Sequence, residues 1–295
     1  MPSERWRVGD VTITKVVENE VSVPLDFFGQ LLPTSSRAEI EAMDWLQPDY
    51  VSEGMALVGY YSFLVQTPTA KIVVDTSVGN SKPRTLPHFN MLDTGFPDDV
   101  QAVWKFDDVD AVVSTHLHVD HVGWNTRLHH GGWVPTFGEA TYHFVELEYL
   151  YWERLADNKD PVEPAFDATV VFNDSIRPVV DSGQASFVGP DARLTPEVSL
   201  LPSPGHTPGH VSVLIQSNDD RAVITGDLMH SPCQLGHPEW SCTYDADRAA
   251  AAATRRVFLE RFADSGTLVI GTHFGTPTGV RVQREGSAFR LAQIG

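Results

Sequence analysis

Cysteine is scarce in this sequence, where Cys233 and Cys242 are the only two among 295 residues. Two cysteines cannot form the disulfide framework of a small secreted domain, so we interpret them as reduced thiols, with a single disulfide as the alternative. The sequence also has no apolar run of about 18 residues, which excludes a membrane-spanning helix. No basic leader precedes an apolar stretch at the N-terminus, and we therefore expect a cytoplasmic protein.

Positive charge is the second shortage. Lys and Arg number 21 against 39 Asp and Glu, which gives a formal net charge of −18. Such a field repels phosphate backbones and anionic lipids, so the sequence predicts neither a nucleic-acid partner nor a membrane partner. A small-molecule substrate is the remaining expectation. Hydrophobic residues make up 42% of the chain, which is enough for a sizeable core.

Strand-like and helix-like patterns alternate along the whole chain, which predicts an α/β architecture. The expected strands are Val11–Val17, Leu57–Gln66, Ala70–Val74, Ala111–Ser114, Val198–Leu201, Val211–Ile215, Ala222–Thr225 and Leu268–Ile270. The expected helices are Ser36–Leu46, Pro97–Phe106, Val145–Leu155 and Asp245–Phe262. Residues 21–56 interrupt the strand pattern, and we interpret them as an excursion over one face of the domain.

The stretch STHLHVDHVGWN, residues 114–125, places three histidines and an aspartate within six positions. His116 and His118 are two residues apart after an apolar strand, so their side chains point the same way. A turn can then present Asp120 and His121 at a neighbouring point. This arrangement suits two adjacent cations. One cluster cannot complete the site, however, because a zinc ion takes about four ligands.

Candidates for the missing ligands follow three other apolar runs. GHTPGH supplies His206 and His210, GDLMH supplies Asp227 and His230, and GTHFG supplies His273. Each lies at the carboxyl end of a strand-like segment, which is where α/β folds place their chemistry.

The ordered set HLHVDH, GHTPGH, GD and GTH resembles the metallo-β-lactamase superfamily, in the branch with five histidines and two aspartates around two metals. The resemblance implies a single domain over residues 1–295 with a four-layer αβ/βα sandwich. It implies that one metal is bound by His116, His118 and His206, the other by Asp120, His121 and His273, and that Asp227 bridges the two. IVVDTSVGN resembles the aspartate-containing turn of the family, which would make Asp75 a support for the ligand loop. His210 is interpreted as structural.

Two divalent ions in such a site lower the pKa of a shared water and polarise the electrophile, so the resemblance implies hydrolysis by a metal-bound hydroxide. Zn²⁺ suits the all-N/O ligand set, with Mn²⁺, Co²⁺ or Fe as alternatives. Asp120 would orient the hydroxide and carry a proton to the leaving group. A homodimer is the base-rate expectation for such enzymes.

The motif residues differ from those of some branches of the superfamily, and these differences narrow the expected substrate class. His230 occupies the position where acyl-homoserine lactonases have a tyrosine, and TGDLMH resembles the branch of methyl parathion hydrolase and related esterases and lactonases. Trp124 replaces a small residue and is expected either to wall the pocket or to pack in the core. The pocket wall would also take aromatic residues from Phe27, Phe28, Phe89 or Phe96. The sequence thus predicts hydrolysis of a neutral, apolar ester or lactone. Phosphotriester hydrolysis is the first alternative, a β-lactamase or thioesterase the next, and a non-catalytic metal-binding protein the last.

Overall fold

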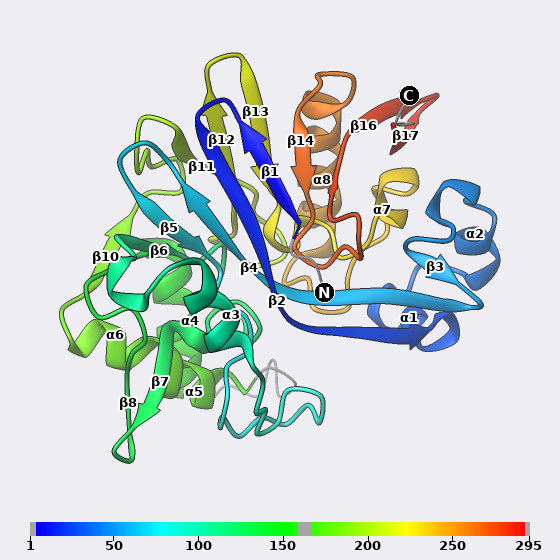
Figure 1. The fold of residues 1–295 in the computed structure, drawn as a ribbon. Coiled ribbons are helices and arrows are strands. Elements are labelled where there is room, and N and C mark those ends of the chain that lie inside the picture. Colours follow the sequence, from blue (N-terminus) through cyan, green and yellow to red (C-terminus); the bar gives the residue numbers. More distant parts are fainter. Residues whose placement is uncertain (1–3, 159–166, 293–295) are drawn as a thin grey trace.

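Two mixed β-sheets form the centre of the molecule (Figure 1). The computed structural model describes residues 4–158 and 167–292. The first sheet has the order β1-β2-β4-β5-β6-β9-β10, with β3 beside β4, and the second has the order β11-β12-β13-β14-β15. Strands of the first sheet are β1 (Arg5–Val8), β2 (Val11–Pro24), β3 (Val51–Ser52), β4 (Met55–Gln66), β5 (Lys71–Val74), β6 (Ala111–Val113), β9 (Thr141–Val145) and β10 (Ala185–Val188).

The second sheet consists of β11 (Val198–Pro202), β12 (Val211–Ser217), β13 (Asp220–Ile224), β14 (Leu268–Ile270) and β15 (Gly279–Val280). Two hairpins lie outside the sheets, β7 (Thr126–His129) with β8 (Gly132–Pro135) and β16 (Val282–Glu285) with β17 (Ala288–Leu291). The α-helices are α1 (Leu25–Leu31), α2 (Arg37–Glu41), α3 (Phe96–Val103), α4 (Glu146–Asn158), α5 (Ala168–Val171), α6 (Arg177–Asp181), α7 (Cys233–Gly236) and α8 (Arg248–Phe262). None of the helices in the described ranges has the length and apolar character that crossing a membrane requires.

The layering follows from the period of two in the strands. In β13, Ala222 and Ile224 belong to a cluster between the two sheets, whereas Val223 belongs to the cluster on the other face. The cluster that contains Val223 also contains Phe258 and Leu259 of α8. Helix α8 therefore covers the outer face of the second sheet. Helices α3 and α4 lie on the first sheet (Figure 1). The expected four-layer sandwich is therefore confirmed.

Several expected elements differ in extent from the observed ones. The helix expected over Ser36–Leu46 is confirmed only at its start, where the Ser36 side chain accepts from Glu39 N and α2 ends at Glu41. The helix expected from Asp245 begins at Arg248, with Asp247 as its N-cap. The segment after Trp124, which is not among the expected strands, forms the β7–β8 hairpin. Sequence patterns also missed α1, α5, α6 and α7.

The carboxyl ends of parallel strands meet at one edge of this sandwich. Strand β5 pairs in parallel with β6, and β13 pairs in parallel with β14. Asp75 follows β5, the 114–125 stretch follows β6, Asp227 follows β13 and His273 follows β14. The β11–β12 connection carries His206. All the segments singled out by the sequence therefore lead to the same region.

Candidate metal centre

The seven expected ligands come together as two groups of buried side chains. Donor atoms of the first group lie within 4.8 Å of one another, and so do those of the second. The first group is His116, His118, His206 and Asp227, and the second is Asp120, His121 and His273. Residues up to 157 positions apart in the chain thus share one site.

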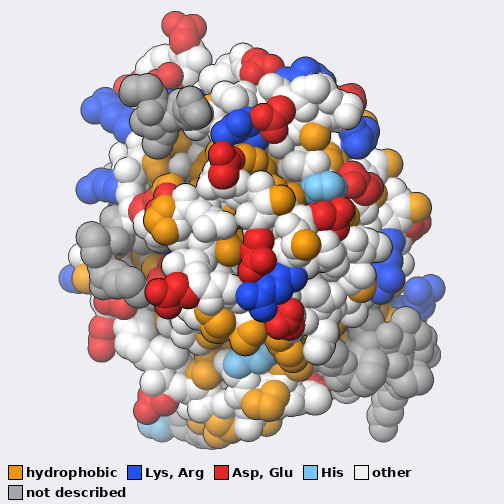
Figure 2. All heavy atoms as spheres, turned by 90° about the vertical axis from the view of Figure 1, so that its right-hand side faces the viewer, with side chains coloured by type: hydrophobic (Ala, Val, Ile, Leu, Met, Phe, Trp, Pro, Cys, Tyr) orange, Lys and Arg blue, Asp and Glu red, His pale blue; other side chains and the backbone are white. Residues whose placement is uncertain are grey.

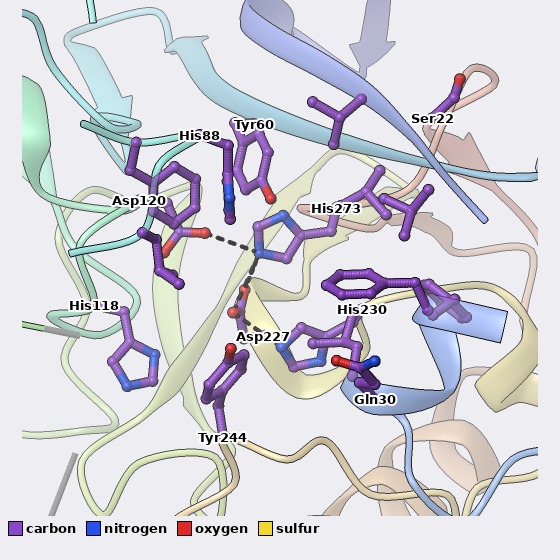
Figure 3. Close-up of a pocket in the computed structure, with 18 of the residues that line it drawn as sticks. Ser22, Gln30, Tyr60, His88, His118, Asp120, Asp227, His230, Tyr244 and His273 are labelled. Carbon is purple, nitrogen blue, oxygen red and sulfur yellow. Dashed lines mark hydrogen bonds and ion pairs between the residues drawn. The ribbon is translucent and has the colours of Figure 1, made fainter. Parts of the chain in front are cut away.

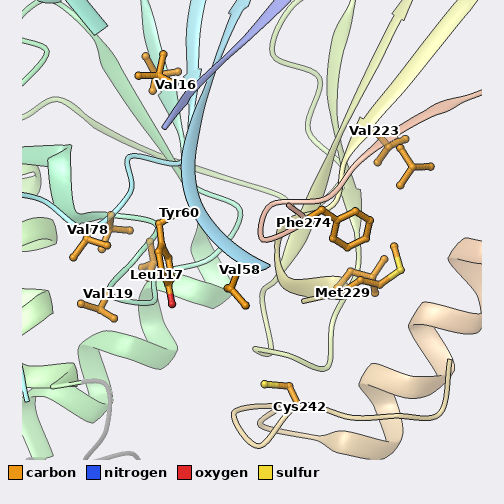
Figure 4. Packing of buried hydrophobic residues seen from close by; sticks show 14 of the residues in the cluster. Val16, Val58, Tyr60, Val78, Leu117, Val119, Val223, Met229, Cys242 and Phe274 are labelled. Atoms are coloured by element: carbon orange, nitrogen blue, oxygen red, sulfur yellow. The ribbon is translucent and has the colours of Figure 1, made fainter. Parts of the chain in front are cut away.

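The ligand loop, residues 114–122, alternates between the site and the core. His116 and His118 face the site, and His116 Nε2 is 2.9 Å from His118 Nδ1. The residues between and after them, Leu117 and Val119, are buried in the apolar cluster that also contains Tyr60 (Figure 4). This alternation of site-facing and core-facing side chains after β6 explains the spacing of the two histidines.

Asp227 of the first group also approaches the second group, and Figure 3 shows it beside His273. Its Oδ1 is 3.1 Å from both His121 Nε2 and His273 Nε2, and its Oδ2 is 3.4 Å from His206 Nε2. The preceding Gly226 has φ +56°, and a Cβ there would meet His210 Nε2 at 2.6 Å. Glycine is needed at this position both for the backbone conformation and for the close approach of the His210 ring.

Outer hydrogen bonds orient the histidine rings. His121 Nδ1 is 2.9 Å from Asp75 Oδ2, and His206 Nδ1 is 2.9 Å from Asp245 Oδ1. His273 Nδ1 is 2.8 Å from the carbonyl oxygen of Gly59. With the Nδ1 proton used in this way, each Nε2 is left with a lone pair that points into the site, as metal-binding histidines require.

The electrostatics of the buried cluster also suit cations. Burial lowers the pKa of His206 to about 4, which keeps its ring neutral. Burial acts to raise the pKa of Asp227, but His121 and His273 lower it well below the usual value. The buried atoms His121 Nε2 and Asp227 Oδ1 have no hydrogen-bond partner among the described residues. Imidazoles, carboxylates and buried atoms without hydrogen-bond partners are the donor set of a two-metal site, so the residues fit two divalent ions.

Two acidic residues of this centre were missed by the sequence analysis. Asp245 was assigned to a helix, yet its carboxylate also accepts from Cys242 N at 2.8 Å and holds His206. Glu148 on α4 accepts from the backbone of both ligand segments, at Leu117 N (3.2 Å) and Gly209 N (2.9 Å). Nothing local distinguishes these carboxylates from surface ones, because their partners are about 30 to 60 residues away in the sequence.

The two further histidines of the motifs have different positions. His210 is buried, its Nδ1 is 3.0 Å from Ser203 O, and its Nε2 accepts from Asp227 N at 2.9 Å. Both ring nitrogens therefore contact protein groups, in keeping with the structural interpretation. His230 lies inside the cavity, with Nε2 3.3 Å from Asp227 Oδ2 and its ring stacked on His273 at 5.6 Å.

A cavity of about 410 Å³ opens above the two groups. Its floor carries His118, His206, Asp120, Asp227, His230 and His273, and its walls are mostly apolar: Val21, Val23, Pro24, Phe27, Phe28, Leu31, Val58, Leu86 and Phe89. Many wall residues come from the end of β2 and from α1, within the 21–56 segment. Tyr60, His88 and Tyr244 are also in the lining.

Trp124 does not line this cavity, and of the two positions expected for it the structure has the one in the core. The indole is buried, donates to Glu18 Oε1 at 2.7 Å, and stacks on Phe96 with ring centroids 5.7 Å apart. Phe96 is likewise absent from the lining, whereas Phe27, Phe28 and Phe89 are present. Glu18 lies at a bulge of β2, between Val17 and Asn19, which turns its carboxylate toward the indole.

Comparisons with known proteins give one family and one fold. A model described as the metallo-beta-lactamase superfamily matches residues 56–273. The transcription termination factor FttA of Pyrococcus abyssi is 25% identical over 252 residues, covering 82% of this chain and 34% of that protein. The chain thus spans about a third of the length of that relative.

Two solved structures share the architecture over nearly the whole chain. The dizinc quorum-quenching lactonase AidC, in complex with a product, has a TM-score of 0.78 at 19% identity, with 99% of this chain and 97% of that chain covered. The hydrolase AbOPH of the beta lactamase superfamily has a TM-score of 0.80 at 22% identity, with the same coverages. At these sequence identities, the similarity to the two structures shows a shared fold and nothing more.

Proposed function

This chain belongs to the metallo-beta-lactamase superfamily, and from that premise we propose that it is a dinuclear metal-dependent hydrolase of neutral, apolar esters or lactones. The observation that carries the proposal is the position of the two ligand groups at the floor of a mostly apolar cavity. Among residues 4–158 and 167–292, no lysine or arginine lines this cavity, so an anionic substrate would find no Lys or Arg side chain there to pair with.

We assign one cation to His116, His118 and His206, and a second to Asp120, His121 and His273, with Asp227 between them. Zn²⁺ is the cation that we expect, because all ligands are imidazole nitrogens and carboxylate oxygens. When bound, two such cations supply a water-derived nucleophile at neutral pH and polarise the acyl oxygen. Asp75 and Asp245 keep His121 and His206 in the tautomers that bind metal.

Asp120 is the residue that we assign to proton transfer. Its side chain lines the cavity, and its Oδ2 lies 3.6 Å from His273 Nε2. The attacking water loses a proton as its oxygen bonds to the acyl carbon, and Asp120 holds that proton. The ester C–O bond then breaks and Asp120 returns the proton to the leaving oxygen, so the residue ends the cycle unchanged.

The apolar wall favours substrates with a hydrocarbon portion. Phe27 is 58% exposed at the mouth of the cavity, while Phe28 and Phe89 are buried along its side. An apolar chain placed against these rings would be removed from water, which contributes about 25 cal/mol per Å² of buried apolar surface. An uncharged phosphotriester meets the same requirements, and it is therefore the second candidate class.

Nucleic acid is the substrate class least consistent with the surface. The relative FttA is a transcription termination factor, but this chain spans only part of it and carries a net charge of −18. On the face of the molecule seen in Figure 2, the described Lys and Arg side chains are interspersed with acidic ones. A phosphodiester backbone would thus meet mostly negative potential.

The test is hydrolysis by purified protein loaded with zinc. We expect turnover of aryl esters or lactones that a chelator abolishes and added zinc restores, with the Asp120→Asn variant inactive even at a zinc concentration that fills both sites. A clearly higher kcat/KM on a phosphotriester than on any ester would move the assignment to the second class. The proposal fails if esters, lactones and phosphotriesters give no chelator-sensitive turnover, or if only thioesters, β-lactams or phosphodiesters do.

A further inference from the structure

Two adjacent tyrosines on β4 face opposite sides of the first sheet. Tyr61 belongs to the cluster between the sheets, and its hydroxyl donates to Phe274 O and Glu20 Oε1, both at 2.9 Å. Tyr60 belongs to the other cluster and lines the cavity above the candidate ligands. The period of two therefore sends one phenol into the structure and the next one into the site.

The Tyr60 hydroxyl differs from those of the other buried tyrosines, because no described residue forms a hydrogen bond with it, although Tyr60 is only 8% exposed. Other buried tyrosines have partners: the hydroxyl of Tyr50 donates to Pro277 O at 2.5 Å, and that of Tyr142 donates to Asn125 O at 3.0 Å. A buried phenol normally finds such a partner. Its partner is therefore expected to be a molecule that enters the cavity.

The ring of Tyr60 is held in place by aromatic contacts. It packs edge-on against His273 at 5.5 Å and against Phe89 at 5.0 Å. Figure 3 shows its hydroxyl end directed toward His273 and the Asp227 region. Burial, followed by the carboxylates of Asp120 and Asp227, raises the pKa of Tyr60 above its ordinary value. The phenol offers one O–H donor beside groups that are mostly acceptors.

We propose that Tyr60 is a catalytic residue, whose hydroxyl donates a hydrogen bond to the acyl oxygen of the substrate as negative charge develops on that oxygen. The inference rests on the proposed ester or lactone hydrolysis and adds a donor that the ligand motifs do not contain. A donor already positioned where charge appears lowers the barrier without reorganisation. Tyr60 neither gains nor loses a proton over the cycle.

The experiment compares zinc-loaded Tyr60→Phe with the native protein on a series of aryl hexanoates that differ in the pKa of the leaving phenol. The variant keeps the ring packing and removes only the hydroxyl. We expect kcat to fall about 10- to 100-fold, KM to change little, and zinc content and unfolding midpoint to stay the same. Tyr149→Phe is the matched control, since its hydroxyl bonds Glu153 outside the cavity and its loss should leave activity unchanged.

The leaving-group series separates the proposed role from others. A donor to the acyl oxygen gives the same fold-loss for every ester, whereas a donor to the leaving oxygen gives a loss that shrinks as the leaving phenol becomes more acidic. Calorimetry gives a readout without turnover: a hydrated alkyl trifluoromethyl ketone should bind Tyr60→Phe more weakly by a factor similar to the loss in kcat/KM. Activity of Tyr60→Phe equal to native activity, or a loss that depends on the leaving group, overturns the assignment. Absence of turnover in the native protein instead rejects the proposed function.

Discussion

Replacing Asp75 by asparagine changes one atom in the support of the ligand loop and should weaken one of the two metal sites. The Asp75 carboxylate is fully buried and accepts from Thr115 N at 2.7 Å, from Thr115 Oγ1 at 2.8 Å and from His121 Nδ1 at 2.9 Å. An asparagine oxygen can still accept from Thr115 N. The amide NH₂ group, however, would face the Nδ1–H of His121, which places a donor against a donor.

His121 then has two outcomes, and both impair binding. Its ring keeps the Nδ1 proton without an acceptor, which costs about 1–3 kcal/mol for a buried donor. Alternatively the proton moves to Nε2, the atom that lies 3.1 Å from Asp227 Oδ1 and points into the site. Substitution of such outer partners typically lowers metal affinity about 10- to 100-fold, which corresponds to about 1.4–2.7 kcal/mol. The two independent figures agree, so the predicted loss is of this size.

The assay is zinc titration of metal-free protein in competition with a chromophoric chelator. For Asp75→Asn we expect one of the two equivalents to bind about 10- to 100-fold more weakly and the other to change less. Asp245→Asn is the matched control, because it removes the corresponding acceptor from His206 in the other group. Native affinity for both equivalents in Asp75→Asn, with the variant folded as judged by circular dichroism, would refute the reasoning.

Three further predictions concern proton transfer, stability and the cavity mouth. Asp120→Asn should lower kcat by about 100-fold or more, measured by steady-state ester hydrolysis at a zinc concentration that fills both sites; native kcat in the variant would show that Asp120 does not carry the proton. Burial, more than any other influence, lowers the pKa of Lys82 to about 7, whereas the unfolded value is 10.5. Between these pH values the unfolded chain binds the extra proton, so the unfolding free energy should rise with pH relative to Lys82→Met, by up to about 1.4 kcal/mol per pH unit. Urea unfolding of both proteins at pH 7 and 9.5 checks this prediction. A difference in unfolding free energy between the native protein and Lys82→Met that is the same at both pH values would contradict it. Phe27→Ala should raise KM more for octanoate than for acetate aryl esters, with little loss of stability because the ring is 58% exposed; equal KM changes would count against an apolar subsite.

Much of the candidate site could be predicted because its residues are carried by short, ordered motifs. His116 and His118 alternate with Leu117 and Val119, so the spacing alone indicates which side chains face the site. Asp227 and His273 follow strands whose apolar runs are visible in the sequence. The helix of Arg248–Phe262 was predicted for a similar local reason, since its alanine-rich pattern needs no distant partner.

The failures share a physical cause. The sequence left Trp124 open between the pocket wall and the core, because Glu18, which accepts from its indole in the core, is 106 residues away in the sequence. The sequence pattern assigned Asp245 to a helix, because its partner His206 is 39 residues away in the sequence. The hairpin after Trp124 and the helices α5 and α6 depend on packing more than on propensity, and tertiary contacts override weak local preferences.

The amino-acid order by itself determined the fold class, the identities of the candidate ligands and the sign of the surface charge, because each of these depends on residues close together in the chain or on a simple sum. Only the tertiary structure decided which face each side chain meets: that Tyr60 rather than Tyr61 enters the cavity, that no Lys or Arg of the described residues lines it, and that the Asp245 carboxylate lies beside Nδ1 of His206. Those properties arise from contacts between segments far apart in the chain, so no local sequence pattern predicts them.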